Sequence, residues 1–281
     1  MTASSFKARS SFAALAAVAI VGSGLAATNG IALAAAPAKH YWVMVFSRPI
    51  AGKEAEFNAW YDQEHIPDML SVPGFEAAQR LVTVQAGTPT STLPPYLAIY
   101  DVATRDLDAT NAEVKRRMTT GVLRKGDAID YPGIVTAIFS PLGPPQLAKS
   151  FAGTTPAAKI PGHDELKSFE LIVFSNPEAT REDEYNHWYD TMHVPDVLHV
   201  PGFISGQRFE LAENASPGTV IPRYLVRFEF KSYDLDATVA EIVVRIKSGK
   251  TRMSTAMAPD SMVYFDSPLG PRMFKAAAAK P

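Results

Sequence analysis

Two histidines, 128 residues apart, stand in nearly the same local sequence. His65 lies in Trp-Tyr-Asp-Gln-Glu-His-Ile-Pro-Asp, and His193 lies in Trp-Tyr-Asp-Thr-Met-His-Val-Pro-Asp. Imidazole titrates near neutral pH without help, so a histidine at a pocket can both accept and donate a proton, with rate effects of about 10²- to 10⁴-fold. We therefore predict that His65 and His193 are catalytic acid–base residues. The alternative is that each caps a broken helix end by bonding to carbonyl groups that the next proline frees.

Aspartates flank both histidines. Asp68 and Asp196 follow them by three residues, and Asp62 and Asp190 precede them by three. A carboxylate bonded to one ring nitrogen would fix the tautomer and raise the basicity of the other nitrogen. We predict this catalytic, orienting role for Asp68 and Asp196. The alternative is that an aspartate directly after a proline bonds backbone N–H groups in a local turn.

Aromatic and cationic residues near the histidines are candidates for substrate binding. The aromatic pairs share the helical stripe of the histidines and could wall a pocket for a flat molecule, or they could be plain core. The arginines could pair with a substrate carboxylate or enolate, or with a local aspartate. The candidates are Tyr61, Tyr189, Trp60, Trp188, Arg80 and Arg208.

Metal and cofactor motifs are absent from the sequence. The chain contains no cysteine, which excludes disulfides, thiolate nucleophiles and zinc–thiolate sites. The pattern His-x-x-Asp with an inserted proline lacks the i, i+4 spacing of a helical zinc site. The sequence has no Gly-rich phosphate loop and no Gly-x-Ser-x-Gly elbow, and no feature demands haem. We therefore expect no metal and no cofactor.

The two histidine motifs belong to an internal repeat. Val45–Arg80 and Val173–Arg208 align at a constant offset of 128 residues, and 21 of the 36 aligned positions are identical. Such a long period indicates a duplicated domain rather than a solenoid. The copies differ beside the histidines, because Glu64 corresponds to Met192, so two sites would not be equivalent. We predict a signal peptide at 1–36, repeats at 40–144 and 167–271, a linker at 145–166 and a tail at 272–281.

The periodicities within the first copy predict six elements that position these side chains. Runs of β-branched and aromatic residues predict strands at 41–47, 75–85, 96–102 and 134–140. Apolar residues at spacings of three and four predict a helix at 54–70, and Asp106 begins a second helix that extends to Thr120. Pro67 is expected to break the first helix beside His65. The order βαββαβ is that of a ferredoxin-like unit.

A ferredoxin-like unit leaves one apolar face of its sheet bare, and a face of that size has to be covered. A linker of about twenty residues holds a second copy at roughly millimolar effective concentration. We therefore predict an α+β fold in which two ferredoxin-like βαββαβ repeats pair sheet-to-sheet as an intrachain pseudo-dimer. Further oligomerisation stays open.

The element order together with Trp-Tyr-Asp-x-x-His-x-Pro-Asp-x-Leu-x-x-Pro-Gly-Phe resembles the dimeric α+β barrel superfamily, and most closely its EthD-like branch. The resemblance covers both repeats. It implies a pseudo-dimeric α+β barrel with the histidine at the barrel cavity. Relatives include cofactor-free monooxygenases, polyketide cyclases, dehydratases, decarboxylases, haem enzymes and proteins without known activity, so the fold alone does not name a reaction.

The first residues have the pattern of an export signal. Lys7 and Arg9 precede an apolar run of small residues, and small-x-small cleavage patterns follow it. The run is interrupted at Gly22-Ser23-Gly24 and is shorter than the roughly 20 apolar residues of a membrane span. We expect a periplasmic or secreted protein with no stable membrane anchor after cleavage. A permanent anchor is the alternative.

The composition excludes other classes of function. The chain has 281 residues, 47% of them hydrophobic, which excludes disorder of the whole chain. Its 27 basic and 29 acidic residues give a formal charge of −2, and no cluster of cations offers a footprint for nucleic acid. We expect a small-molecule ligand and no nucleic-acid partner.

The leading hypothesis is an exported, cofactor-independent enzyme of the lyase, cyclase or isomerase type. It would act on a small apolar or aromatic carbonyl compound, with His65 or His193 as general acid–base residue. The alternatives are a non-catalytic periplasmic protein that binds a hydrophobic ligand, and a cofactor-free monooxygenase. A further possibility is a scaffold whose barrel centre is filled by side chains.

Overall fold

The computed structural model describes residues 36–86, 93–150, 156–216 and 218–277. Contacts group Pro37–Pro281 into one compact unit. The predicted signal peptide lies outside the described residues except for Ala36. In the described part of the chain, no helix is both long enough and apolar enough to cross a membrane.

The first half of this unit runs from β1 to β4. Its elements are β1 (Lys39–Ser47), α1 (Glu54–Trp60), a π-helical turn (Tyr61–His65), α2 (Ile66–Leu70), β2 (Phe75–Ala86), β3 (Tyr96–Thr104), α3 (Leu107–Thr119), a 3-10 turn (Tyr131–Gly133) and β4 (Val135–Pro141). The ends of the four predicted strands agree with the structure to within two residues.

The second half repeats the same order. Its elements are β6 (Lys167–Ser175), α4 (Glu182–Trp188), a π-helical turn (Tyr189–His193), α5 (Val194–Leu198), β7 (Phe203–Asn214), β8 (Tyr224–Ser232), α6 (Leu235–Lys247) and β9 (Met262–Pro268). The predicted linker contains the short strand β5 (Gln146–Leu147) and a 3-10 turn (Ala148–Ser150), and the predicted tail contains β10 (Met273–Phe274).

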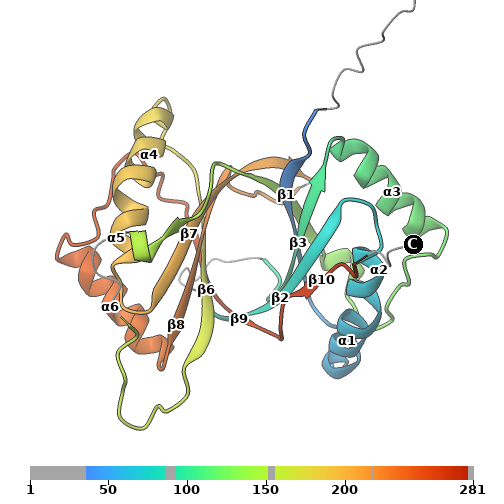
Figure 1. Ribbon diagram of the computed structural model, residues 1–281, viewed down its shortest axis with the longest axis horizontal. Coiled ribbons are helices and arrows are strands. Elements are labelled where there is room, and N and C mark those ends of the chain that lie inside the picture. The colour runs from blue at the N-terminus through green and yellow to red at the C-terminus, as the bar shows by residue number, and fades with distance from the viewer. Residues whose placement is uncertain (1–35, 87–92, 151–155, 217, 278–281) are drawn as a thin grey trace, which may run out of the picture. The chain divides into compact units, whose positions relative to one another are not determined.

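Eight antiparallel strands close into a barrel. Their order is β2-β3-β1-β4-β7-β8-β6-β9, and β9 pairs with β2 to complete the ring. The halves therefore join along two seams, β4 with β7 and β9 with β2. Helices α1 to α3 lie on one side of the strands, and α4 to α6 lie on the opposite side (Figure 1). Closure leaves no unpaired edge among these eight strands.

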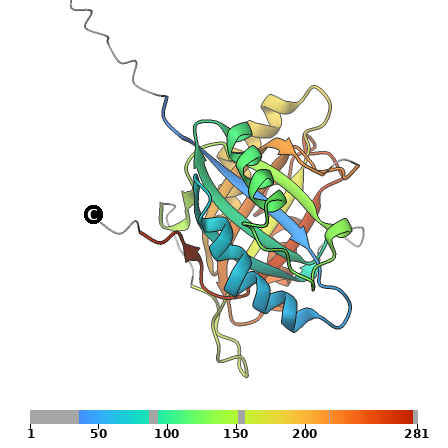
Figure 2. The ribbon, with the colours of Figure 1, turned by 90° about the vertical axis from the view of Figure 1, so that its right-hand side faces the viewer.

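Large side chains from both halves fill the inside of the barrel. Alternate residues of each strand point inward, and the rings of Phe139 and Phe174, one from each half, lie 5.9 Å apart between centroids. The scaffold hypothesis expects such a filled centre. The outward-facing residues of each sheet pack under that half's own helices as two separate cores. Figure 2 shows the helices of the first half lying across the strands.

We predicted that the first helix breaks beside its proline, but the helical path continues through it in both halves. The residue before proline disfavours helical geometry, yet Ile66 has φ −64° and ψ −47°. A π-helical turn over Tyr61–His65 inserts one extra residue into the hydrogen-bond ladder just ahead of Pro67, which has no N–H to offer. The helical path therefore continues to Leu70, and His65 ends a π-turn rather than a helix.

Side-chain caps fix the second helix of each half. The carboxylate of Asp106 accepts a hydrogen bond from the Ala109 amide at 2.9 Å, and that of Asp234 accepts one from Ala237 at 3.1 Å. Such caps stabilise a helix by about 1 kcal/mol. The predicted start of the helix at Asp106 is confirmed.

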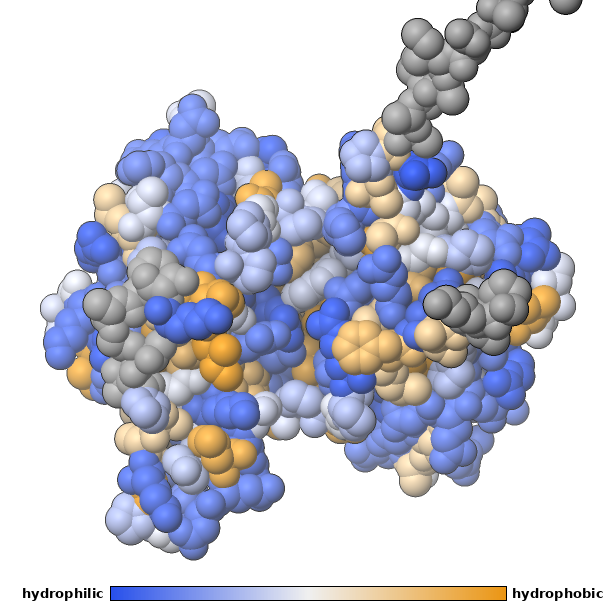
Figure 3. Space-filling model, in the orientation of Figure 1, coloured by the Kyte–Doolittle hydropathy of each residue, from blue (hydrophilic) through white to orange (hydrophobic). Residues whose placement is uncertain are grey.

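The face in Figure 3 is mainly hydrophilic, with apolar patches separated by polar residues.

Candidate functional site

A cavity of about 310 Å³ lies in the first half, between the helices and the outer face of the sheet. Tyr100 and Ile138 come from the strands, Trp60 and His65 from the first helical segment, and Met118 from α3. The volume falls at the small end of the range for ligand pockets. The resemblance implies a histidine at the barrel cavity, and here the structure corrects it. His65 lines a cavity outside the barrel, under the helices.

The second half also contributes to the wall of this cavity. Glu213 of β7 lines it and accepts a hydrogen bond of 3.0 Å from the side-chain amide of Asn111 on α3. The cavity of the first half is therefore complete only when the two halves are joined.

The π-helical turn brings three aromatic rings together at the cavity. Trp60 and His65 stack with ring centroids 4.5 Å apart and an interplanar angle of 26°. Tyr61 meets the His65 ring edge-on at 5.1 Å, and its hydroxyl lies 3.4 Å from the Ser47 hydroxyl. All three side chains line the cavity, and their predicted roles in substrate binding and catalysis stay predictions. Tyr61 also belongs to the core beside the cavity, and Trp60 packs against that core.

Burial controls the charge of His65. It lowers the pKa of the imidazole to about 4, the nearby Asp68 carboxylate opposes this, and the charge of Arg80 lowers the pKa further. At neutral pH the ring is therefore uncharged and has a lone pair to offer.

Three buried polar atoms of the cavity residues have no hydrogen-bond partner among the described residues. They are Trp60 Nε1, His65 Nδ1 and the Tyr100 hydroxyl. A buried donor without a partner costs about 1 to 3 kcal/mol. Such groups at one cavity are the expected sign of a site that a polar atom of a ligand completes.

In the second half the matching groups are satisfied by the protein itself. The backbone carbonyl of Arg252 accepts a hydrogen bond from Trp188 Nε1 at 3.0 Å and lies 3.2 Å from His193 Nδ1. Burial again lowers the pKa of His193 to about 4, although the bond to Arg252 and the Asp196 charge oppose it. His193 therefore matches the capping alternative, and a catalytic role finds no support in its geometry.

Phenylalanines occupy the second half where the first half has smaller or polar residues. Phe228, Phe230 and Phe265 stand at the positions of Tyr100, Val102 and Ile138. The ring of Phe230 packs edge-on against Phe265, with centroids 6.3 Å apart, and Phe203 stacks on Phe230 with centroids 4.7 Å apart. The two halves are thus unequal, as the differing motif residues predict, and the open site belongs to the first half.

The aspartates that follow the histidines do not orient the rings. Asp68 binds the guanidinium of Arg124 through two bonds of 2.9 and 3.0 Å, and Asp196 binds Arg252 through two bonds of 2.8 Å. The bonds from Arg124 hold the pKa of Asp68 below its ordinary value. We predicted a catalytic role for Asp68 and Asp196, and the structure instead gives each a structural ion pair. The preceding proline turns the carboxylate away from the ring and toward the loop that carries the arginine.

The strand arginines that occur in both halves also have local partners. Arg80 donates to Asp62 at 2.8 Å and to the side chain of Asn58 at 2.5 Å, and it lies over the Tyr61 ring at 4.6 Å. Arg208 repeats this arrangement with Asp190 at 2.9 Å. Neither arginine is among the residues that line the cavity. The geometry of Arg80 and Arg208 matches their local-pairing alternative, and their role in substrate binding stays a prediction.

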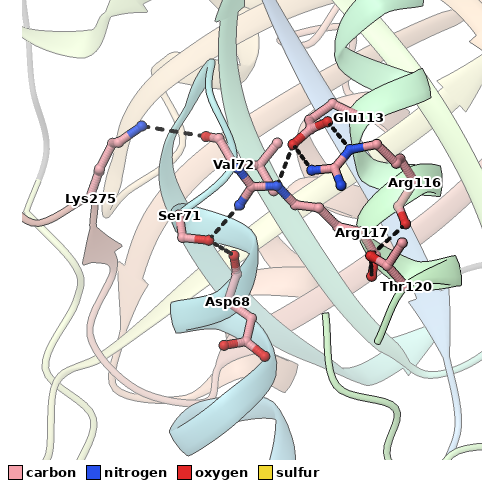
Figure 4. A network of polar contacts seen from close by, with 8 residues as sticks. All are labelled: Asp68, Ser71, Val72, Glu113, Arg116, Arg117, Thr120 and Lys275. Carbon is pink, nitrogen blue, oxygen red and sulfur yellow. Dashed lines mark hydrogen bonds and ion pairs between the residues drawn. The ribbon is translucent and has the colours of Figure 1, made fainter. Parts of the chain in front are cut away.

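The outer wall of the cavity is held by polar contacts of α3. Figure 4 shows Arg117 reaching from α3 to the Ser71 hydroxyl at the end of α2, with a bond of 2.9 Å. Glu113 holds the guanidinium of Arg117 at 2.6 Å. These contacts fix the distance between the two helical segments that enclose the cavity.

Sequence reasoning missed Tyr100, Arg124 and Gly126. A Cβ atom added to Gly126 would lie 2.5 Å from the Trp60 ring, so only glycine allows this loop to pack on the indole. The signal for Tyr100 was its replacement by phenylalanine in the second copy, at an otherwise similar strand position. Among the described residues, no group of three His, Asp or Glu side chains is placed to hold a metal ion.

No protein-family model matches the chain, and no curated protein is significantly similar to it in sequence. Solved structures are similar in fold. An anthrone oxidase-like protein matches with a TM-score of 0.52 and 13% identity, covering 86% of this chain and 97% of its own. A proposed monooxygenase from Fusobacterium nucleatum matches with a TM-score of 0.50 and 10% identity, covering 85% of this chain and 96% of its own. The chain therefore shares the α+β barrel fold of these proteins.

Proposed function

We propose that the cavity of the first half is the active site of a small-molecule enzyme, with His65 as its general acid–base residue. The observation that carries the proposal is the pairing of a mainly apolar cavity with an uncharged histidine whose buried Nδ1 has no hydrogen-bond partner among the described residues. A cavity of about 310 Å³ suits a compact, largely apolar molecule with one polar group. This is the small aromatic carbonyl compound that the sequence favours.

The chemistry would be proton transfer at a carbon next to the carbonyl group. The neutral ring of His65 accepts the proton, and the cation that forms is stabilised by the enolate it leaves behind, which offsets the cost of charging a buried ring. Trp60 Nε1 and the Tyr100 hydroxyl are donors that could stabilise the enolate oxygen. Isomerisation, dehydration and cyclisation all begin with this step, so a lyase or isomerase without a cofactor is the reaction class that we propose.

The proposal also covers the origin of the two halves, the role of the second half and export. The repeated element order supports a gene duplication in which two ferredoxin-like units form an intrachain pseudo-dimer of the EthD-like type. The second unit would then serve as scaffold and supply Glu213 to the wall of the active site. The amino-terminal pattern supports export to the periplasm or the medium.

A second candidate function is cofactor-free oxygenation, which the descriptions of the two similar structures favour. The first step would be the same, because an enolate or phenolate is the form that reacts with dioxygen. Oxygen uptake that matches substrate loss, measured with an oxygen electrode, would support this candidate, and unchanged turnover under argon would support the lyase or isomerase.

Filling the cavity tests the proposal. Ile138→Phe copies Phe265 of the second half, so the larger ring is expected to occupy the cavity at little cost, or with a gain of about 1 kcal/mol in the free energy of unfolding. Turnover of any substrate found in a panel of aromatic ketones and aldehydes should fall at least tenfold. Initial rates and thermal melts of the same preparations provide the measurement. The matched control is Phe265→Leu, for which we expect unchanged turnover; a folded Ile138→Phe protein with full activity would refute the proposed location.

A further inference from the structure

The second half shows where a single oxygen atom can satisfy both rings of the motif. The Arg252 carbonyl lies 3.0 Å from Trp188 Nε1 and 3.2 Å from His193 Nδ1. A carbonyl oxygen only accepts hydrogen bonds, so the proton of His193 must be on Nδ1. One acceptor therefore binds the indole N–H and the imidazole N–H together.

The first half presents the same two rings without that acceptor. Trp60 and His65 lie 4.5 Å apart between centroids, as Trp188 and His193 do, and the interplanar angles are 26° and 33°. Yet within the described part of the chain neither Trp60 Nε1 nor His65 Nδ1 has a partner. The first half thus keeps the indole and imidazole nitrogens of the pair, but no carbonyl group of the described residues bonds to them.

Two contacts of the loop that carries Arg124 have no counterpart in the second half. Its guanidinium binds Glu64 at 3.1 Å in addition to Asp68, whereas Met192 stands at the matching position of the second half. The backbone N–H of Gly126 donates to the Tyr131 hydroxyl at 3.0 Å, whereas the second half has Pro259 there. The residues that anchor this loop through Glu64 and Tyr131 are therefore specific to the first half.

We propose that the carbonyl oxygen of the ligand takes, in the first half, the position that the Arg252 carbonyl oxygen holds in the second half. There it would accept hydrogen bonds from Trp60 Nε1 and His65 Nδ1. This inference rests on the proposed function and narrows its substrate class to flat, apolar ketones and aldehydes. The two nitrogens are shielded from water, so the loop has to yield slightly as the oxygen enters, and Gly121 and Gly126 flank Arg124.

With its proton on Nδ1, the ring of His65 acts on the substrate oxygen as a hydrogen-bond donor. Trp60 becomes a specificity residue, because an indole N–H without an acceptor is costly and a ligand without oxygen leaves it unpaired.

Two probes of nearly equal shape test the inference. 1-Tetralone carries a ring carbonyl group, and tetralin has a methylene group in its place. Isothermal titration calorimetry of the whole protein should show 1-tetralone binding about 10- to 100-fold more tightly than tetralin. Infrared spectra with carbonyl-¹³C tetralone should show a lower carbonyl stretching frequency on binding, the signature of hydrogen-bond donors at the oxygen.

Trp60→Phe should reduce the preference for 1-tetralone at least threefold and move the carbonyl frequency back toward its value in an apolar solvent. Trp188→Phe is the matched control, which removes the equivalent donor in the second half and should leave both readings unchanged. Equal binding of tetralone and tetralin would overturn this inference while leaving the cavity as a ligand site. If neither compound binds up to its solubility limit, the inference and the proposed function both fail.

Discussion

Replacing His65 by glutamine is expected to lower turnover by about 10²- to 10⁴-fold, the range for loss of a general acid–base residue. The amide keeps the length and polarity of the side chain but cannot exchange a proton. The stack on Trp60 is lost, so thermal melts must accompany the rates. Initial rates of the wild-type protein and the variant on one substrate provide the measurement.

The pH dependence of turnover is a second test of the role of His65. Because burial lowers the pKa of His65 to about 4, the base is already deprotonated at pH 6 and above, and turnover should be constant there. Below that range the rate should fall, with an apparent pKa of about 4 in the free enzyme. His193→Gln is the control, since that ring binds a backbone carbonyl, and it should change turnover less than threefold. Equal losses in the two variants would contradict a site confined to the first half.

The unfolding free energy is expected to fall as pH rises from about 4 to 7, because of one carboxyl group at a barrel seam. Asp266 of β9 pairs with Glu170 of β6 on one side and with Thr83 of β2 on the other. It is 2% exposed, and its Oδ1 atom has no partner among the described residues. Burial raises its pKa from 3.8 to about 7; the Thr83 hydroxyl opposes this, and the Glu170 charge adds to it.

The sign follows from the proton balance. A carboxyl group whose pKa is higher in the folded protein keeps its proton there at a pH at which the unfolded chain has lost it. The contribution of Asp266 to the unfolding free energy is therefore fully present below pH 4 and is lost as the pH rises to 7. At 1.36 kcal/mol per unit the loss is on the order of 4 kcal/mol. The Glu170 carboxylate beside it forms an ion pair with Arg227, which also pairs with Glu229.

Asp266→Asn should remove this dependence and stabilise the protein at pH 7.5. Urea unfolding followed by circular dichroism at several pH values measures both effects. Asp164→Asn is the control, because that side chain is 89% exposed and its ion pair of 3.8 Å should contribute little. A variant as pH-dependent as the wild type would show that Asp266 is ionised in the folded protein.

The sequence predicted the elements of this fold because the periodicities are strong and occur twice. The run of β-branched and aromatic residues in β1 and the cap at Asp106 needed only local information. The π-helical turn before Pro67 was not predictable in the same way, since it depends on the core that holds Tyr61 and Ile66 in place.

The candidate site was predictable only in part. His65 and Trp60 stand out by type and spacing, whereas Tyr100 lies on a strand whose pattern reads as plain core. The role of Asp68 was misassigned because its true partner, Arg124, lies 56 residues away. Local sequence cannot say which of several nearby carboxylates a side chain will meet.

The seam between β2 and β9 has a consequence for biosynthesis. Leu81 of β2 lies opposite Pro268 of β9, so this partner of β2 is made only after the rest of the second half up to β9. Until then the nascent first half displays an open strand edge, which invites pairing with other chains. Contacts so distant in sequence slow folding, and we expect the rate-limiting step of refolding to be the docking of this final strand.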